Sequence, residues 1–357
     1  MMMSLFAPLF ALLAASAAAP AEASPPRPAE VQFYKDWYAV CDNGGACEAG
    51  IAGQDFNFDA AMVLRVRRAT GPDGYFSILI QSQLENVTGA SLSVDGKELA
   101  SGPIDEEGRL VIGRDKALAI ARALAEGRVA EVSFSAPRVA PAIEQVTLAG
   151  SSAALRYMDA EQMRAGTVDA IVAVGASGYA AAPPPLPQIG QQPPDPGGEV
   201  PMIGQMMAIA RPADCELPEG FDRTPTFDKL GRDASHETAI ILMPCNSGAY
   251  NFTSVVFVAQ RAIGGKAWTI EPAKFDFGDN MWSDDGPLQL VNAFFDADSG
   301  RLATYAKGRG IGDCGSADSY VFDGSRFRLV ERRDMPECRG VWEWPTVWRA
   351  SAVPYKR

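Results

Sequence analysis

Alternating apolar and polar residues dominate the chain after residue 31 and predict β-strands rather than long helices. The runs AAMVLRVRRAT (60–70) and GYFSILIQSQL (74–84) are rich in β-branched and aromatic residues. The sequence GPDG between them predicts a turn, because proline presets φ and glycine accepts a positive φ. The two runs therefore predict a hairpin, and SLSVDGKEL (91–99) predicts a shorter one around its Asp-Gly pair.

The period changes to that of a helix in DKALAIARALAEG (115–127). Apolar residues such as Leu118, Ala121 and Leu124 share one face there, and Gly127 ends the pattern. We expect one amphipathic helix at this place. Residues 146–175 predict a strand, a short helix and a last apolar strand.

After residue 201 the chain predicts strands and turns without a long helix. Runs such as AIILMPC and TSVVFVAQRA follow one another at short spacing, and FFDADSGRLATY and YVFDGSRFRLVE resemble two similar hairpins. This spacing is typical of an antiparallel meander, barrel or sandwich.

A proline-rich stretch separates the two patterns. Residues 181–201 hold eight prolines and almost no large apolar side chains, which predicts an extended linker. We therefore expect a mainly β fold, between all-β and α+β, with two antiparallel β-rich domains. These are residues 31–180, which carry the amphipathic helix, and residues 202–357.

The N-terminus indicates the compartment. Residues 5–19 are almost wholly apolar, and small residues with an Ala-Glu-Ala site follow, so residues 1–23 are predicted to be a secretory signal peptide. No later apolar run reaches the length of a spanning helix. We expect an exported protein, periplasmic or secreted, without a transmembrane segment.

Export decides how the six cysteines are interpreted, because an even number in an oxidising compartment favours disulfides over metal or thiol chemistry. Many pairings are open in principle. Cys41 and Cys47 flank a short turn, and Cys314 and Cys338 flank a strand–turn–strand unit. These spacings favour two local bonds and leave Cys215 to pair with Cys245.

The formal net charge of −12 and the pI of about 4.7 disfavour nucleic acid and anionic membranes as partners, because both require clustered Lys and Arg. The hexapeptide GIGDCG (310–315) matches a dinucleotide-binding pattern. A strand–turn–strand follows it, however, and no helix is available to receive a pyrophosphate. We expect a tight loop at this place, tied down by Cys314, and no cofactor.

Two groups of charged residues are candidate ion sites. The first is a set of cations on or beside the glycine-rich loop, predicted to bind an anion: Lys307, Arg309 and Arg339. The second is a run of acids between residues 276 and 286 that is a candidate calcium site: Asp276, Asp279, Asp284 and Asp285. The favoured interpretation of the first group is pairing with acids elsewhere in the chain, and that of the second group is solvated turn acids.

Catalytic patterns are incomplete. His236 is the sole histidine and no G-x-S-x-G sequence occurs, so neither a serine hydrolase triad nor a common zinc site is predicted. We assign no catalytic residue, although two of the many carboxylates could meet as in a glycosidase. Trp342 and Trp344 would share one face of a strand, as core packing or as a platform for sugar stacking.

Three segments together carry a family resemblance: the opening W-x-x-x-C-D-N-x-x-x-C from Trp37 to Cys47, AALRYMDAEQMRAGTVDAIV (153–172), and KGRGIGDCG with MPECRG (307–315 and 335–340). They resemble a family of exported proteobacterial proteins known only as a domain of unknown function. The first half is also similar to the invasion-associated locus B proteins. The resemblance implies a periplasmic location, structural disulfides and no assigned catalytic residue. Where the family has Gln-Gly-Arg, this chain has Gln162-Met163-Arg164.

These observations favour a non-catalytic periplasmic binding or envelope-associated protein whose ligand belongs to the envelope or the extracytoplasmic space. Two alternatives stay open. One is an envelope enzyme, such as a glycan hydrolase that uses a pair of carboxylates. The other is a virulence-related surface or secreted factor, which rests on the resemblance alone.

Overall fold

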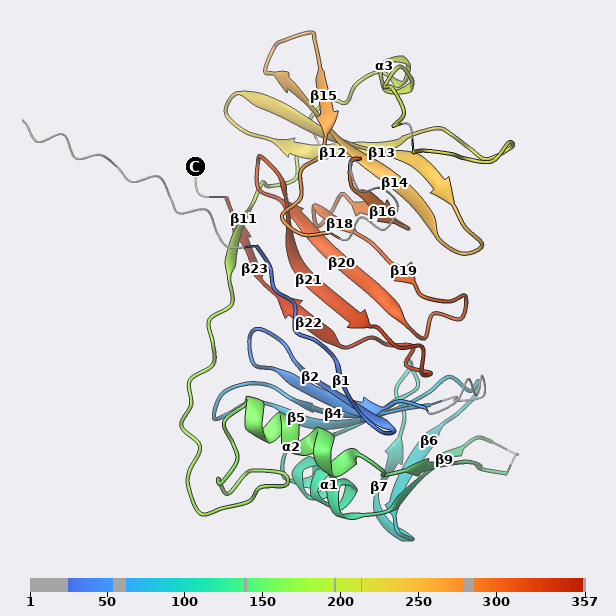
Figure 1. Cartoon of the computed structure of the whole chain (residues 1–357), viewed down its shortest axis with the longest axis vertical. Helices are drawn as coiled ribbons and strands as arrows, with labels where there is room; N and C mark the ends of the chain where they lie inside the picture. The colour runs from blue at the N-terminus through green and yellow to red at the C-terminus, as the bar shows by residue number, and fades with distance from the viewer. Residues whose placement is uncertain are drawn as a thin grey trace, which may run out of the picture.

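A computed structural model of the chain describes residues 25–53, 62–137, 140–195, 197–212, 214–278 and 286–355. The predicted signal peptide (1–23) lies outside these residues. Strands dominate the described residues, in several antiparallel sheets, which confirms the expected mainly β fold. The sheets follow one another along the long axis of the molecule (Figure 1).

The first sheet of the N-terminal half (residues 25–180) contains six antiparallel strands in the order β1-β2-β3-β4-β5-β8. Their bounds are Gln32–Tyr34 (β1), Trp37–Cys41 (β2), Cys47–Ile51 (β3), Met62–Arg68 (β4), Phe76–Ser82 (β5) and Arg109–Gly113 (β8). The hairpin predicted over residues 60–84 is confirmed, because β4 pairs with β5 along its whole length.

A second sheet has the order β10-β9-β6-β7. Its strands are Gly89–Val94 (β6), Lys97–Pro103 (β7), Val129–Ser135 (β9) and Ala142–Thr147 (β10). Two helices, Arg114–Glu126 (α1) and Ser151–Glu161 (α2), pack against the first sheet, with α1 on β5 and α2 on β2. One apolar core, which includes Leu64, Leu92 and Leu124, joins both sheets and both helices.

The last apolar strand expected within residues 146–175 does not form. A strand needs its backbone N–H groups for a neighbouring strand. Here the carboxylate of Asp159 on α2 accepts the N–H groups of Ile171, Val172 and Ala173 instead, at 2.9, 2.8 and 3.3 Å. This buried side chain therefore folds the segment into turns, and an isolated bridge joins Thr167 to Ser177.

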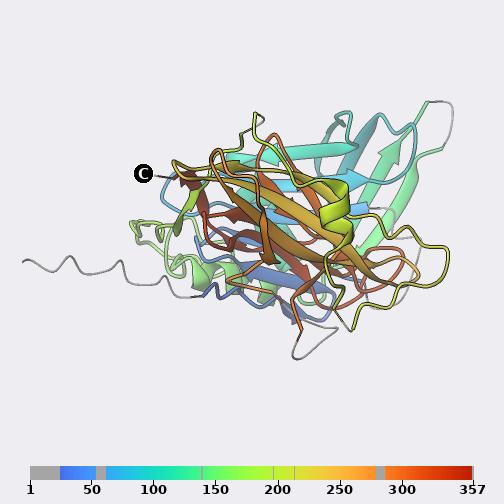
Figure 2. The ribbon, with the colours of Figure 1, turned by 90° about the horizontal axis from the view of Figure 1, so that it is seen from above.

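The C-terminal half (residues 202–355) has two sheets that enclose an apolar core. One sheet contains Thr226–Arg232 (β12), His236–Ser247 (β13), Phe252–Ala262 (β14), Thr269–Pro272 (β15) and Gln289–Val291 (β16). The other contains Phe294–Asp296 (β17), Arg301–Ala303 (β18), Ala306–Lys307 (β19), Gly315–Phe322 (β20), Phe327–Met335 (β21) and Thr346–Arg349 (β22). The short helix Ile203–Met207 (α3) covers the outer face of the first of these sheets (Figure 2). Its Met206 belongs to an apolar cluster that includes Ile241 of β13.

The proline-rich stretch runs along one side of the molecule from α2 to the C-terminal half. Within it, residues Gln188–Gln191 form a strand (β11) that pairs in parallel with Ser351–Pro354 (β23). Part of the expected linker is thus hydrogen-bonded rather than a free spacer. The domain boundaries stay a prediction.

A further apolar cluster crosses from one half to the other. Tyr38 and Val40 of β2 share it with Met335, Val341 and Val347 of the C-terminal half. The first sheet is therefore covered on both faces, by its own helices on one side and by the C-terminal half on the other. Among the described residues, no helix is long and apolar enough to cross a membrane.

Candidate functional site

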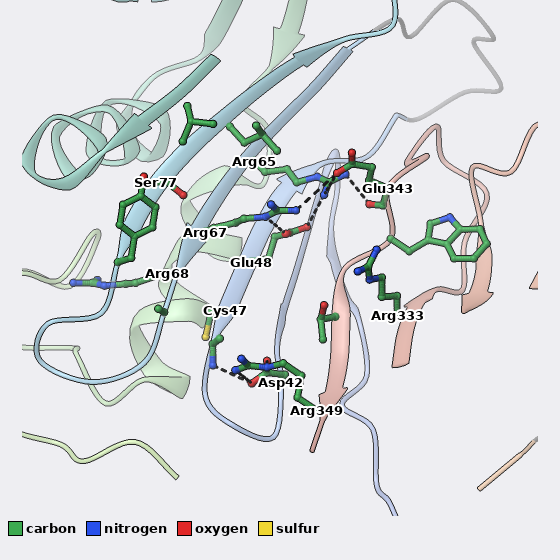
Figure 3. Close-up of a pocket in the computed structure, with 17 residues that line it drawn as sticks. Asp42, Cys47, Glu48, Arg65, Arg67, Arg68, Ser77, Arg333, Glu343 and Arg349 are labelled. Carbon is green, nitrogen blue, oxygen red and sulfur yellow. Dashed lines mark hydrogen bonds and ion pairs between the residues drawn. The ribbon is translucent and has the colours of Figure 1, made fainter. Parts of the chain in front are cut away.

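A cavity of about 660 Å³ lies where the first sheet faces the C-terminal half (Figure 3). Strands β3, β4, β5 and β8 supply one wall, and β21, β22 and residues 341–345 supply the other. We call this cavity the arginine cleft, because five arginines line it beside three acids. They are Arg65, Arg67, Arg68, Arg333 and Arg349, with Asp42, Glu48 and Glu343.

Strand alternation places the arginines of β4. Successive side chains of a strand point to opposite faces. Leu64 and Val66 belong to the core under the helices, so Arg65 and Arg67 face the cleft. Arg68 lies four residues after Leu64, so its side chain points to the same face of the sheet as Leu64, away from the cleft. There its guanidinium donates to the Asp169 carboxylate at 3.1 Å. Burial lowers the pKa of Arg68 to about 10.

Glu48 of β3 is the anionic centre of the cleft wall. Its carboxylate accepts hydrogen bonds from the Tyr38 hydroxyl at 2.6 Å and from Nε of Arg67 at 2.5 Å. Nη1 of Arg65 lies 3.6 Å away. Burial alone would raise the pKa of Glu48, but the two arginines favour the carboxylate and bring its pKa below the ordinary value. Glu48 is therefore a charged group at neutral pH.

Arg65 joins the two halves from a buried position, with 1% of its side chain exposed. Its Nη1 lies 3.0 Å from the Glu343 carboxylate, and its Nη2 donates to the Glu343 backbone carbonyl at 2.7 Å. Burial opposes the charge of Arg65, yet Glu48, Tyr38 and Glu343 raise its pKa above the ordinary value. The guanidinium thus holds residue 343 against β4 across the cleft.

The disulfide turn between β2 and β3 forms one end of the cleft. The Asp42 carboxylate accepts the N–H groups of Gly44 and Ala46 at 2.8 and 3.0 Å and pairs with the Arg349 guanidinium. Asn43 binds the backbone of the same Arg349 through both atoms of its amide. The turn closed by Cys41 and Cys47 therefore docks directly on β22.

Arg67 and Arg333 are the two most exposed arginines of the cleft, with 44% and 56% of their side chains exposed. Arg333 uses Nε to bind Glu331 at 2.8 Å. Among the described residues, its two Nη atoms have no hydrogen-bond partner. Figure 3 shows the two guanidinium groups on opposite walls. Such forks suit carboxylate and phosphate groups.

Trp344 adds an indole to the wall of the cleft that contains β21 and β22. The side chain is buried, stacks on Tyr305 with ring centroids 4.6 Å apart, and lines the cleft. Its Nε1–H has no hydrogen-bond partner among the described residues. A buried donor without a partner costs stability, and a bound acceptor relieves that cost.

A family model matches residues 31–351, which is most of the chain, and this match shows its family. The chain belongs to the family described as "Protein of unknown function (DUF1176)". It is 28% identical to "Uncharacterized protein YpfG" of Escherichia coli (strain K12), over 88% of this chain and 91% of that protein. The crystal structure of invasion associated protein B from Bartonella henselae matches 38% of this chain and 99% of its own chain, with 20% identity and a TM-score of 0.29.

Residues 162–164 of this DUF1176 chain, where the resemblance seen in the sequence implies Gln-Gly-Arg, fasten the disulfide turn to α2. The Gln162 amide donates to the carbonyls of Gly45 and Arg68 at 2.8 and 3.1 Å. Arg164 pairs with Asp169 and donates to the Gly71 carbonyl. Between them, Met163 has a φ of 56°, a conformation that glycine adopts without strain. The glycine that the resemblance implies at this position would therefore adopt this backbone conformation without strain.

The three disulfides of the DUF1176 chain join the pairs that the spacing favours: Cys41–Cys47, Cys215–Cys245 and Cys314–Cys338. No cysteine is free. The last bond closes the glycine-rich loop, which contains no helix. Gly315 has a φ of 136°, and a Cβ there would lie 2.0 Å from the Ala306 carbonyl oxygen. The glycine at position 315 therefore allows the loop to pack closely against the backbone of Ala306.

The predicted anion residues have separate partners. Arg309 pairs with the Asp313 carboxylate, which also accepts the N–H of Gly340 at 2.8 Å. Arg339 donates to the backbone carbonyls of Lys35 and Gly53, so it docks the C-terminal half on the N-terminal half. The Lys307 ammonium lies 5.6 Å from the Tyr250 ring centroid.

The candidate calcium residue Asp276 and the sole histidine, His236, are not among the described residues that line the arginine cleft. Asp276 binds the Arg328 guanidinium and the Leu329 N–H, at 2.5 and 2.9 Å; the other three candidate calcium residues, Asp279, Asp284 and Asp285, lie outside the described residues. The one group with metal-ligand geometry among the described residues contains Cys314 and Cys338, which are bonded to each other. His236 is an exposed residue that contacts its neighbour Ser235.

The tryptophans do not form the expected strand face. Residues 341–345 are irregular, and β22 begins at Thr346. Trp344 stacks on Tyr305, whereas Trp348 packs against the core of the C-terminal half and donates to the Leu329 carbonyl at 3.4 Å. The sequence had shown Arg65 and Arg67 at alternate positions of a predicted strand, and this was the available sign of the cleft.

Proposed function

We propose that this protein is an exported, periplasmic binding protein that captures an anionic ligand in the arginine cleft. The observation that carries the proposal is the placement of Arg67 and Arg333. They come from different halves of the chain and present guanidinium groups to one cavity.

The local charge supports this proposal. The whole chain carries a formal charge of −12, yet the lining of the cleft has more arginines than acids, even without Arg68, whose guanidinium lies on the opposite side of the sheet. A concave site with an excess of positive charge in an acidic protein concentrates anionic ligands. The cavity volume also lies within the usual range for small-molecule sites.

The donors favour a ligand with at least two acidic groups, either carboxylates or phosphates. One group would bind Arg67 on β4 and the other Arg333 on β21, while the indole N–H of Trp344 would serve a further oxygen. A carboxylate and a phosphate each present two oxygens that arginine binds through two parallel hydrogen bonds. The ligand would then bridge the two halves.

Export is supported by the cysteines, all of which are in disulfides. Disulfides persist in the periplasm and are rare in the reducing cytoplasm. The proposal predicts that mature protein from a periplasmic fraction begins at Ser24. Full-length protein found in the cytoplasm with free thiols would contradict it.

A carboxylate-driven hydrolase receives less support from the same cleft. A glycosidase requires one carboxyl group that stays protonated and donates its proton. The arginines beside Glu48 lower its pKa, which opposes that role. Binding without turnover is therefore the better account.

A thermal-shift screen tests the binding proposal. Citrate, pyrophosphate and orthophosphate would be compared at constant ionic strength with the wild type, Arg67→Gln and Arg333→Gln. We expect at least one anion to raise Tm in the wild type and to raise it less in both variants. Arg128→Gln removes an exposed arginine outside the cleft and is the control. Equal shifts in all four proteins, or no shift with any anion, would refute the proposal.

A further inference from the structure

A second cavity, of about 430 Å³, lies in the C-terminal half at the ends of β11, β12 and β23. It is separate from the arginine cleft and shares no lining residue with it. The turn between β20 and β21 closes one side through Asp323 and Gly324. Tyr355, which follows β23, closes another side.

Gln192 distinguishes this cavity from an ordinary surface hollow. The residue lines the cavity and is only 7% exposed. Its side-chain Nε2 is buried and has no hydrogen-bond partner among the described residues. Buried amide groups nearly always have partners in folded proteins. A Cβ added to Gly231 would lie 3.0 Å from this nitrogen, so the amide packs between β12 and the cavity, where an acceptor supplied by a ligand would give it a partner.

The aromatic ring beside it is held in place. Tyr355 is half exposed, and its backbone N–H donates to the Gln191 carbonyl at 2.9 Å. A Cβ added to Gly190 would lie 3.2 Å from the ring, so the absence of a side chain at Gly190 lets the ring rest on β11. One edge of the cavity thus has a fixed, partly open aromatic surface.

The remaining groups provide both donors and acceptors. Arg232 binds Asp195 through Nε at 2.7 Å, and its guanidinium borders the cavity. Asp233 accepts its local hydrogen bonds through Oδ1 alone. Among the described residues its Oδ2 has no hydrogen-bond partner. Asp323 lies on the same cavity wall.

From this combination we propose that the second cavity binds a neutral saccharide. A sugar hydroxyl accepts from the Gln192 amide while other hydroxyls donate to Asp233, and the apolar face of the ring packs on Tyr355. Hydroxyl groups are both donors and acceptors, which matches a wall that offers both. Two carboxylates and one arginine line this cavity, so it lacks the excess of positive charge that would attract an anion to the arginine cleft.

Saturation-transfer NMR of the full-length mature protein tests this site, with cellobiose, lactose and chitobiose as probes. We expect signals from at least one disaccharide, with the strongest transfer to protons on one ring face. Gln192→Leu should weaken binding at least about tenfold and should raise Tm, because it removes an orphaned buried donor. Loss of binding together with gain of stability separates a ligand-binding role from damage to the fold.

Two further variants complete the experiment. Tyr355→Ala should also remove the saccharide signal, whereas Gln145→Ala, an exposed glutamine in the other half, should leave it unchanged. Arg67→Gln should retain saccharide binding, so failure of the anion proposal and failure of this one are distinguishable. The absence of signals from all three sugars, or signals that persist in Gln192→Leu, would overturn the proposal.

Discussion

Asn43 and Arg349 lie 306 positions apart in the sequence and bind each other through two hydrogen bonds. The Asn43 amide donates to the Arg349 carbonyl at 2.8 Å, and the Arg349 N–H donates to the Asn43 amide oxygen at 2.7 Å. The Asn43 side chain thus makes the two backbone hydrogen bonds that a neighbouring strand would make with β22. The disulfide turn that presents Asn43 acts as a fastener between the two halves.

Asn43→Ala should weaken this contact, because it leaves both backbone groups of Arg349 without their partner. We expect the free energy of unfolding to fall by about 1–3 kcal/mol, measured by urea denaturation. Gln83→Ala, an exposed position outside the contact, should change it little. Equal stability of Asn43→Ala and the wild type would show that the contact contributes nothing.

Met163→Gly should stabilise the protein, although it removes a side chain. Met163 is 67% exposed and has a φ of 56°, so glycine relieves backbone strain at little cost in contacts. The greater freedom of glycine in the unfolded state offsets part of this gain, and we expect a net increase of about 0.5 kcal/mol. Met163→Ala keeps the strain and is the control. A loss of stability in the glycine variant, measured by urea denaturation, would contradict this account.

Glu48 should give the protein a distinct stability loss in acid. Its pKa is lowered in the folded state, so its contribution is fully present above the unfolded value of about 4.3 and is lost as the pH falls through the lower folded value. Glu48→Gln should cost about 2–3 kcal/mol near neutral pH, because the buried Arg65 loses one of its two carboxylate partners.

The difference between the wild type and Glu48→Gln should then shrink below about pH 4, where the wild-type carboxylate also becomes neutral. Urea denaturation between about pH 7 and about pH 3 measures both effects. Glu126→Gln, at the exposed end of α1, controls for the loss of one negative charge. A difference that stays constant over this range would refute the assigned role of Glu48.

Local patterns predicted those parts of the fold whose partners are close in sequence. The β4–β5 hairpin follows from two alternating runs around a turn, and α1 follows from its apolar period. The strand expected before residue 175 failed because its N–H groups bind Asp159 on the preceding helix. Alternation describes which face a residue occupies and does not reveal a side chain that competes for backbone donors.

The arginine cleft illustrates the same limit. Arg65 and Arg67 stand at alternate positions of a predicted strand, so their shared face was visible in the sequence. The residue that binds Arg65 across the cleft, Glu343, lies 278 positions away. Charged residues pair through the tertiary fold, and sequence spacing carries no information about such distant contacts.

Isothermal titration calorimetry on a double-mutant cycle tests the central claim, that one anionic ligand bridges Arg67 and Arg333. The anion with the largest thermal shift would be titrated into the wild type, Arg67→Gln, Arg333→Gln and the double variant. We expect each single variant to raise Kd about tenfold or more, and the double variant to lose less than the product of the two effects, because a bridging ligand couples both contacts. An unchanged Kd in either single variant would contradict the claim.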